Sequence, residues 1–458
     1  MPAIITDRFK KEILLSLQKD IDSAANSYYV SVGRPIDWDS ADTAPTPSNT
    51  IRTIRDAQYN MTAVKNVEAH SFVIPRYTWS LGAIYQGYND NSSGHPTNSF
   101  YVITDENNVY VCLEAGQAAT GQSVTSTVKP TGTLTTAFET ADGYVWKFLF
   151  LYSVGALRAS QFLAANFMPV TKFGLFDSSS PADHVEQVGI QNAAIGGEVV
   201  GYQVTGGGSG YTTVPTVTII GNGTEAKGTA TINGGAVTKI NVKDSDGNKA
   251  HGSAYTYAHV EITDGNGTGA TARPIIGPAS GFGADPRDDL KATAMMFTSK
   301  PEGDEGANWV VNNDFRQVTL IKNIELPDSD AIFGGVTGNA LRRMTFNSAP
   351  SAAFSADKTI EGVSSLARAY VVKADSASVW YIQDSDTQFT AFTEGETISE
   401  VDGNGAGILL NTGADSDSYA YLNGDVDPNS GEVMYIDNRA AIQRSADQTE
   451  DIKIIIQL

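Results

Sequence analysis

Residues that could perform chemistry are few in this chain, and they are scattered. The sequence has no Walker loop and no Gly-x-Ser-x-Gly elbow in a strand-to-helix context. Gly403, Gly405 and Gly407 lack a following helix, which favours a β-turn over a phosphate-binding loop. The histidines show no spacing typical of metal ligands; they are His70, His95, His184, His251 and His259. We therefore predict a protein that is not an enzyme and that binds no cofactor or metal.

Two acidic stretches resemble the beginning of a calcium-binding loop. Residues 244–248 have the alternating acidic pattern, but Lys249 and Tyr255 stand where an EF-hand has its glycine and its bidentate glutamate. Residues 425–429 fail similarly, with Ile436 at the twelfth position. We expect turns at both places, although a bound cation stays open. The 52 Asp and Glu residues also leave open a carboxylate pair at glycosidase spacing.

Length and charge exclude several classes of protein. A chain of 458 residues is too long for one hydrophobic core, so two to four domains are expected. The net charge of −21 argues against direct binding of nucleic acid and against an anionic membrane surface. Glycine, at 44 residues, outnumbers lysine plus arginine at 31, which favours short strands and tight turns over long helices.

The single cysteine and the chain's beginning indicate the compartment. Cys112 lies in an apolar run and is expected to be a small buried core residue. No basic region followed by an apolar stretch opens the sequence, so no signal peptide is expected. The longest apolar run, residues 145–157, contains Lys147 and is shorter than the roughly 20 residues of a membrane span. We expect a soluble protein made in the cytoplasm.

The first sixty residues predict two helices that flank a strand. Thr6 or Asp7 can cap a helix whose apolar stripe has the helical period; the stripe consists of Phe9, Ile13, Leu14, Leu17 and Ile21. A strand is expected at residues 28–32. Ser48 or Asn49 is expected to cap a second helix at about residues 50–60.

From Val64 onward the pattern is typical of β-structure. Strands are expected at residues 73–75, 100–103 and 109–113, with a hairpin loop at 105–108. Residues 144–150 alternate aromatic side chains, and both faces of this strand are too apolar to be exposed. Trp146 is therefore predicted to lie in a core.

Two glycine-rich stretches interrupt this pattern. In the first, residues 186–278, the sequences at 208–212 and 221–224 both recur 44 residues later. Two copies of one β-hairpin unit, stacked on each other, would bury what one copy could not. The second, residues 353–421, resembles a small β-barrel or sandwich that contains the aromatic pair Trp380 and Tyr381.

The last thirty residues form two β-rich runs, 430–439 and 452–456, joined by a polar connection. A segment as apolar as the second run is expected to be a strand tied into a core or pressed against a partner. Arg439 and Arg76 could pair with Asp or Glu and hold loops in register, or they could be exposed arginines on turns.

Five segments of the chain have a particular wording and follow one another in a particular order. Their residues are Gly33, Arg34, Trp38; Pro75, Arg76, Trp79; Gly143, Tyr144, Trp146; Phe315, Arg316; and Gly431, Glu432, Tyr435, Asn438, Arg439, Asp447, Gln448, Thr449. In this order they resemble the dimeric baseplate wedge subunit of T-even-like contractile-tailed bacteriophages. The resemblance covers residues 5–176, 288–346 and 423–458 and excludes the two glycine-rich stretches.

The resemblance implies a mainly β fold with a few helices, a homodimer without enzymatic activity, and neighbouring wedge proteins as partners in the virion. We expect a β-sandwich-like core, residues 1–185, 281–350 and 423–458, interrupted by inserted modules at 186–280 and 351–422. Two alternatives stay open. One is a receptor- or carbohydrate-binding tail protein, suggested by Trp380 and Tyr381. The other is a tail-associated glycan hydrolase that uses carboxylates.

Overall fold

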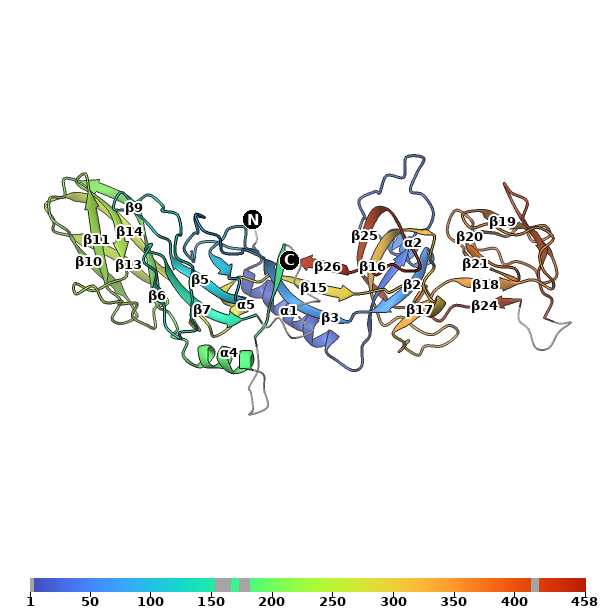
Figure 1. The fold of residues 1–458 in the computed structure, drawn as a ribbon, viewed down its shortest axis with the longest axis horizontal. Helices are drawn as coiled ribbons and strands as arrows, with labels where there is room; N and C mark the ends of the chain where they lie inside the picture. The colour runs from blue at the N-terminus through green and yellow to red at the C-terminus, as the bar shows by residue number, and fades with distance from the viewer. Residues whose placement is uncertain (1–3, 153–165, 173–181, 413–419) are drawn as a thin grey trace. The chain divides into compact units, whose positions relative to one another are not determined.

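The fold is mainly β, as the composition predicts, and its strands are antiparallel within several small sheets. The computed structural model describes residues 4–152, 166–172, 182–412 and 420–458 (Figure 1). The expected segments 1–185 and 351–422, and the apolar run 145–157, therefore include stretches outside the described residues. The chain forms two compact units. Unit 1 contains Met1–Leu15, Ser71–Met296 and Ile455–Leu458, and unit 2 contains Ser16–His70 and Phe297–Ile454.

One sheet of unit 1 contains the aromatic strand that the sequence predicts. Its order is β4-β5-β7-β6, with β4 at Tyr101–Ile103, β5 at Asn108–Glu114, β7 at Val145–Leu151 and β6 at Phe138–Glu139. The expected hairpin joins β4 to β5, and Asn107 adopts the left-handed backbone conformation at φ 64° in its loop. Helix α4, Ala182–Asn192, lies against β7. Trp146 and Cys112 are fully buried in this core, as predicted.

A second sheet, of order β26-β15-β3-β8, includes the chain positions at which the two units divide. Its strands are β26 (Ile452–Gln457), β15 (Ala294–Ser299), β3 (Ala69–Pro75) and β8 (Phe167–Val170). Helix α1 spans Asp7–Ile21, and the Thr6 hydroxyl accepts a hydrogen bond from Phe9 N at 3.3 Å, which confirms Thr6 as a cap. Leu14 is buried, whereas Phe9 and Ile13 are 57% and 42% exposed. The apolar stripe of α1 is therefore only partly covered by the chain itself.

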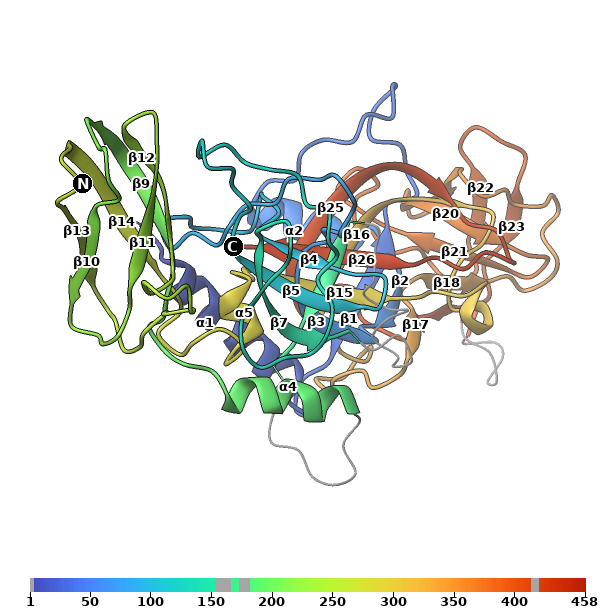
Figure 2. The ribbon, with the colours of Figure 1, turned by 60° about the vertical axis from the view of Figure 1, so that its left-hand side comes forward.

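Among the described residues, the strands of the glycine-rich region of unit 1 pair with one another and form two sheets, of order β12-β11-β10-β13 and β14-β9 (Figures 1 and 2). The strands are β9 (Val199–Ser209), β10 (Thr216–Gly221), β11 (Gly228–Asn233), β12 (Ala236–Asn241), β13 (Ala258–Thr263) and β14 (Thr268–Ile276). Short helix α5, Pro286–Asp289, follows and is capped by Asp285.

The two copies of the 44-residue repeat interlock instead of stacking as separate hairpins. The Tyr211 hydroxyl of the first copy accepts a hydrogen bond from Ala270 N of the second, at 3.3 Å. In return, the Tyr255 hydroxyl of the second copy accepts one from Ala226 N of the first, also at 3.3 Å. Strands β10 and β13 pair antiparallel between the copies. The repeat therefore has a local two-fold arrangement in which each copy completes the other.

Unit 2 contains a five-stranded sheet of order β17-β2-β1-β16-β25. Its strands are β17 (Thr337–Asn339), β2 (Met61–Asn66), β1 (Tyr28–Gly33), β16 (Asp314–Lys322) and β25 (Glu432–Gln443). Helix α2 spans Ile51–Tyr59, but Thr50 caps it, not Ser48 or Asn49. Thr50 has the extended backbone of a cap, and its hydroxyl accepts a hydrogen bond from Thr53 N at 3.2 Å.

The rest of unit 2 is a seven-stranded sheet of order β23-β22-β19-β20-β21-β18-β24. Its strands are β18 (Arg342–Thr345), β19 (Thr359–Gly362), β20 (Arg368–Ala374), β21 (Ser378–Ile382), β22 (Thr397–Glu400), β23 (Ala406–Ile408) and β24 (Tyr421–Leu422). Strand β18 pairs with β21 and β24, although it precedes residue 351, where the sequence places the start of this module. The division of the chain into five segments stays a prediction.

Candidate functional site

Three of the five segments that carry the resemblance meet on neighbouring strands of unit 2. In the five-stranded sheet, β16 lies between β1 and β25. Gln317 on β16 is paired with Gly33 at the end of β1 and with Asn438 in the middle of β25. Gly33 therefore lies at the same level of one sheet as Gln317, about 300 positions later in the sequence, and Asn438, about 400 positions later.

The centre of this site is Arg316, which is only 4% exposed. Its Nε donates hydrogen bonds to both carboxylate oxygens of Asp42, at 2.7 and 2.9 Å. Its Nη1 donates to the Pro35 carbonyl at 2.7 Å, and its Nη2 donates to Asp37 Oδ1 at 2.5 Å and to Asp314 Oδ2 at 3.2 Å. A planar guanidinium suits this geometry because its five N–H groups point in fixed directions. We call Arg316 and its acceptors the Arg316 cluster.

The charge of Arg316 changes the acidity of its partner. The hydrogen bond from Arg316, followed by the one from Trp38 N, lowers the pKa of Asp42 below its ordinary value of 3.8. Asp42 is therefore ionised at neutral pH, and the loop that contains it is held on β16 by a charged pair.

Arg34 and Trp38 fasten the same loop to the next strand. Arg34 has a positive φ of 59°, and its guanidinium lies 4.8 Å from the centre of the Trp38 ring. The indole Nε1 of Trp38 donates to the Arg439 carbonyl at 2.9 Å, and Asn438 Nδ2 donates to the Pro45 carbonyl at 2.9 Å. The loop between residues 34 and 47 thereby bridges β1 and β25.

Gly33 is required by close packing of the backbone. A Cβ atom at this position would lie 2.4 Å from the Asn60 carbonyl oxygen, so no other residue fits without a shift of the chain. Phe315, next to the arginine, is buried opposite Ile442. The sequence identified Gly33, Arg34, Trp38 and Arg316 through the resemblance.

The remaining residues of the 430–439 run lie along β25. Gly431 has a positive φ of 70° just before the strand, Glu432 is opposite Lys322, and Tyr435 is opposite Leu320. The Arg439 guanidinium pairs with Asp437 of its own strand, at 2.7 Å. The Arg439 side chain therefore does pair with an acidic residue. The loop between residues 34 and 47 is contacted by the Arg439 backbone carbonyl and not by its guanidinium.

A second group of expected residues lies in the core of unit 1. Trp146 is stacked on Tyr144, with ring centres 5.7 Å apart and an angle of 18° between the planes. The indole Nε1 of Trp79 donates to Ser126 Oγ at 3.1 Å. Gly143 adopts a φ of 82° in the turn before β7. These residues build a buried aromatic core.

Pro75 and Arg76 at the end of β3 contribute through their backbones. The Pro75 carbonyl accepts a hydrogen bond from the Tyr101 hydroxyl at 2.7 Å, and Arg76 N donates to the Asn166 carbonyl at 2.9 Å. Within the described residues, the Arg76 side chain makes no ion pair, and its Nε has no hydrogen-bond partner. The proposed pairing of Arg76 with Asp or Glu is therefore absent from that part of the chain.

The third group, Asp447, Gln448 and Thr449, belongs to a turn in unit 2. The Gln448 carbonyl accepts a hydrogen bond from Gly303 N at 2.8 Å, and Thr449 forms a β-bridge with Glu302. Asp447 is exposed. The residue that anchors this turn was not predicted from the sequence.

That residue is Arg444, which is 2% exposed and lies 4.9 Å above the Trp309 ring. Its Nε donates to Glu450 at 2.6 Å. The aspartates of the Arg316 cluster were missed as well. Asp42 stands in a loop rich in Asp, Ser and Pro, where nothing local distinguishes it, and it is 274 positions from the arginine it binds.

Other candidates from the sequence have structural roles. Asp244 Oδ1 accepts hydrogen bonds from Asp246 N at 3.0 Å and Asn248 N at 2.8 Å, so this acidic stretch forms a turn. Asp427 likewise accepts from Asn429 N at 2.9 Å. In the part of the chain that the structure describes, no three His, Cys, Asp or Glu side chains are grouped so as to hold a metal ion.

The aromatic pair that suggested carbohydrate binding is occupied by protein contacts. Tyr381 is 4% exposed and lies edge-on to Phe392. The Trp380 ring is contacted by Arg343 at 5.7 Å and by Lys373 at 4.9 Å. Tyr381 is therefore a core residue, whereas Trp380 is partly exposed and has two cations beside its ring.

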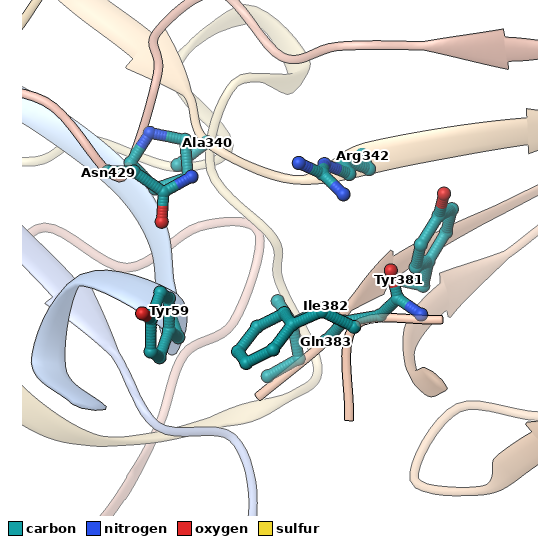
Figure 3. Close-up of a pocket in the computed structure, with 9 residues that line it drawn as sticks. Tyr59, Ala340, Arg342, Tyr381, Ile382, Gln383 and Asn429 are labelled. Carbon is teal, nitrogen blue, oxygen red and sulfur yellow. The ribbon is translucent and has the colours of Figure 1, made fainter. Parts of the chain in front are cut away.

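A small cavity of about 100 Å³ lies beside this pair in unit 2 (Figure 3). Tyr59 and Phe389 form part of its wall, with ring centres 4.7 Å apart. The Arg342 guanidinium and the Asn429 side chain also face this space (Figure 3). The cavity has room for a few waters or a single functional group, which is well below the roughly 300 Å³ of typical ligand pockets.

No protein-family model matches the chain, and no curated protein matches it. Among the helices of the described residues, none is both long and apolar enough to cross a lipid bilayer.

Proposed function

We propose that this chain is a structural subunit of the baseplate wedge of a contractile phage tail. In this proposal a homodimer joins neighbouring wedge proteins while the baseplate assembles in the host cytoplasm and when it rearranges on contraction. The observation that carries the proposal is the convergence around Arg316. Residues singled out by the resemblance in three distant segments occupy adjacent strands and hydrogen-bond the same loop.

The chemistry of the Arg316 cluster supports a mechanical role. One buried arginine, three carboxylates and a backbone carbonyl form a network that fixes a loop on a sheet. Such a network holds a surface in one shape, as a subunit that must fit several neighbours requires. The outer strand of this sheet, β25, is twelve residues long and carries the half-exposed Met434. A long edge strand is a surface on which another chain can pair.

Two measurements test the proposal. Light scattering on the purified chain should give a mass near 97 kDa, twice the 48.6 kDa of one chain. Averaged electron-microscopy images of the particle should place the chain in the body of the baseplate. A 48.6 kDa species, together with density at a fibre tip instead of the baseplate, would contradict the proposal and favour a receptor-binding role.

A further inference from the structure

A larger cavity, of about 330 Å³, lies in unit 1 where the glycine-rich region meets the aromatic sheet. Strand β9 contacts both β5 and β12 here, and the wall includes Glu114, Gln117, Gly201, Tyr202, Lys239 and Ile275. Its volume falls in the range of pockets that hold small molecules.

Three polar side chains in this wall have no partner. Glu114, Gln117 and Lys239 make no side-chain hydrogen bond and no ion pair with any residue that the structure describes. Burial raises the pKa of Glu114, although nearby Lys249 and Lys239 act in the opposite direction. Glu114 and Lys239 are partly buried, and Gln117 is exposed. A partly buried carboxyl group with no hydrogen bond to the protein is a group that a ligand can contact.

Other polar groups of the wall are partly engaged. The Tyr202 hydroxyl donates to the Lys227 carbonyl at 3.0 Å. Asn89 Oδ1 and Gln203 Oε1 accept hydrogen bonds from Arg273, at 2.6 and 2.8 Å. The groups left for a ligand are therefore the Glu114 carboxyl group, the Lys239 ammonium group, the Gln117 amide, and the side-chain NH2 groups of Asn89 and Gln203.

A neighbouring cavity of unit 1 shows the contrast. It measures about 400 Å³ and is lined by charged residues of α1 and of the segment around α5. Three of its four cations are engaged: Lys11 with Asp288, Arg287 with Asp285, and Lys291 with the backbone of Ser92 at 2.6 Å. The fourth, Arg8, is exposed. The partly buried cations of that cavity are therefore held by protein groups, whereas Lys239 in the cavity around Glu114 is not.

The free groups and the apolar wall indicate the chemistry of the ligand. Glu114 and Lys239 have opposite charges, so a ligand with charge of one sign only would be attracted by one and repelled by the other. A ligand that is uncharged, donates and accepts hydrogen bonds, and has an apolar face satisfies all of them. Hydroxyl groups do both, and Tyr202 and Ile275 offer apolar surface. We propose that this cavity binds an uncharged sugar ring.

This site does not depend on the assembly role proposed above. A sugar ring fills a substantial part of 330 Å³, while the 100 Å³ cavity of Figure 3 cannot enclose one. This cavity is separate from Trp380 and Tyr381, at which carbohydrate binding stays a prediction from the sequence.

The test is direct titration of the full chain with uncharged monosaccharides. Glucose, galactose and N-acetylglucosamine are followed by saturation-transfer NMR and calorimetry, with glucosamine and glucuronic acid as charged counterparts. We expect at least one uncharged sugar to bind and its affinity to fall about tenfold or more in Glu114→Gln, because charged hydrogen bonds are the stronger ones. Glu261→Gln is the matched control, since Glu261 is exposed on β13 of the same unit.

A second variant, Gly201→Ala, tests the same cavity if Glu114→Gln folds poorly. Gly201 lacks a positive φ, and a Cβ added there meets no atom closer than 3.5 Å. Gly201→Ala should therefore fold normally while its methyl group reduces the space and weakens binding. Failure of all three uncharged sugars to bind, tighter binding of a charged counterpart, or unchanged affinity in both cavity variants would overturn the proposal.

Discussion

At the scale of single residues, Arg316 shows how one side chain connects distant parts of this chain. A buried guanidinium is stabilised where its N–H groups meet acceptors, and Arg316 has three carboxylates and a carbonyl. Lysine is no substitute because its point charge cannot match the two oxygens of Asp42 and the other acceptors at once. The residue type follows from the geometry that it must satisfy.

Replacing Arg316 should loosen the loop between residues 34 and 47. We expect Arg316→Lys to lower the free energy of unfolding by about 1.5–3 kcal/mol, the value of hydrogen bonds to a charged group. Hydrogen exchange should accelerate at the loop amides. The control is Arg52→Lys: Arg52 is 81% exposed and pairs with Asp56 across one helical turn at 3.6 Å, so its loss should change stability little. Equal effects of the two substitutions would contradict the role given to Arg316.

The same cluster predicts a dependence on pH. The folded pKa of Asp42 is lowered, so its stabilising contribution is complete above the ordinary value of 3.8 and is lost as the pH falls through the lower folded value. Loop exchange, corrected for intrinsic rates, should therefore accelerate below about pH 4. In Arg316→Lys this acid response should be weaker. A response of the same size in both proteins would assign it to other carboxylates.

Arg316 was singled out from the sequence through the resemblance, but its partners were not. The short run around Phe315 and Arg316 is distinctive enough to be noticed, whereas Asp37 and Asp42 stand in a loop where acidic residues are ordinary. Pairing across 274 positions leaves no local pattern, because it depends on which strands become neighbours in the sheet. Arg444 was missed for the same reason.

At the scale of elements, local patterns predicted well what depends on neighbours in sequence. The hairpin between β4 and β5 and the cap at Thr6 are confirmed. The cap of α2 was wrong by one or two positions, because Ser48, Asn49 and Thr50 are all competent caps and backbone geometry selected Thr50. The repeat was detectable from its spacing, but the exchange of Tyr211 and Tyr255 between copies was not.

The interlocked repeat should be sensitive to a methyl group at Gly252. That glycine has a φ of 61°, and a Cβ there would lie 2.2 Å from the Thr224 carbonyl oxygen and 2.3 Å from Ala226 N. Gly252→Ala combines left-handed strain with a backbone clash, so we expect a loss of about 3 kcal/mol or more from the unfolding free energy of unit 1.

Gly247 provides the matched control for this substitution. It lies in the same region with a φ of 85°, but a Cβ there meets nothing within 4 Å. Gly247→Ala should therefore cost only the strain, about 1–2 kcal/mol. Urea unfolding curves and hydrogen exchange of β10 and β13 measure both variants. If the two substitutions cost the same, the close approach of the two copies carries no energetic weight.

At the scale of the whole molecule, composition predicted the class of fold but not which segments associate. A composition rich in glycine, threonine and valine predicts short strands and tight turns, and the chain is mainly β. Unit 1 nevertheless gathers the first residues, Met1–Leu15, with the last, Ile455–Leu458. Strand β18 likewise joins strands that follow it by dozens of residues. Such choices are made by long-range pairing, for which a single sequence has no local signal.

The end of the chain gives the final prediction. Strand β26 is the edge of its four-stranded sheet, Ile454 is 4% exposed, and Leu458 N donates to the Thr293 carbonyl at 3.1 Å. Deleting residues 452–458 would remove this apolar burial, at about 25 cal/mol per Å², and expose the edge of β15. Because an uncovered edge strand pairs with other chains, we expect the truncated protein to aggregate. Soluble yield and light scattering measure the outcome.

The control is the double substitution Ile4→Ser and Ile5→Ser. These side chains are 83% and 60% exposed, so their replacement should leave solubility unchanged. A truncated chain with the solubility and mass of the intact one would mean that β26 is dispensable, and that the apolar end of the sequence serves a partner and not the fold.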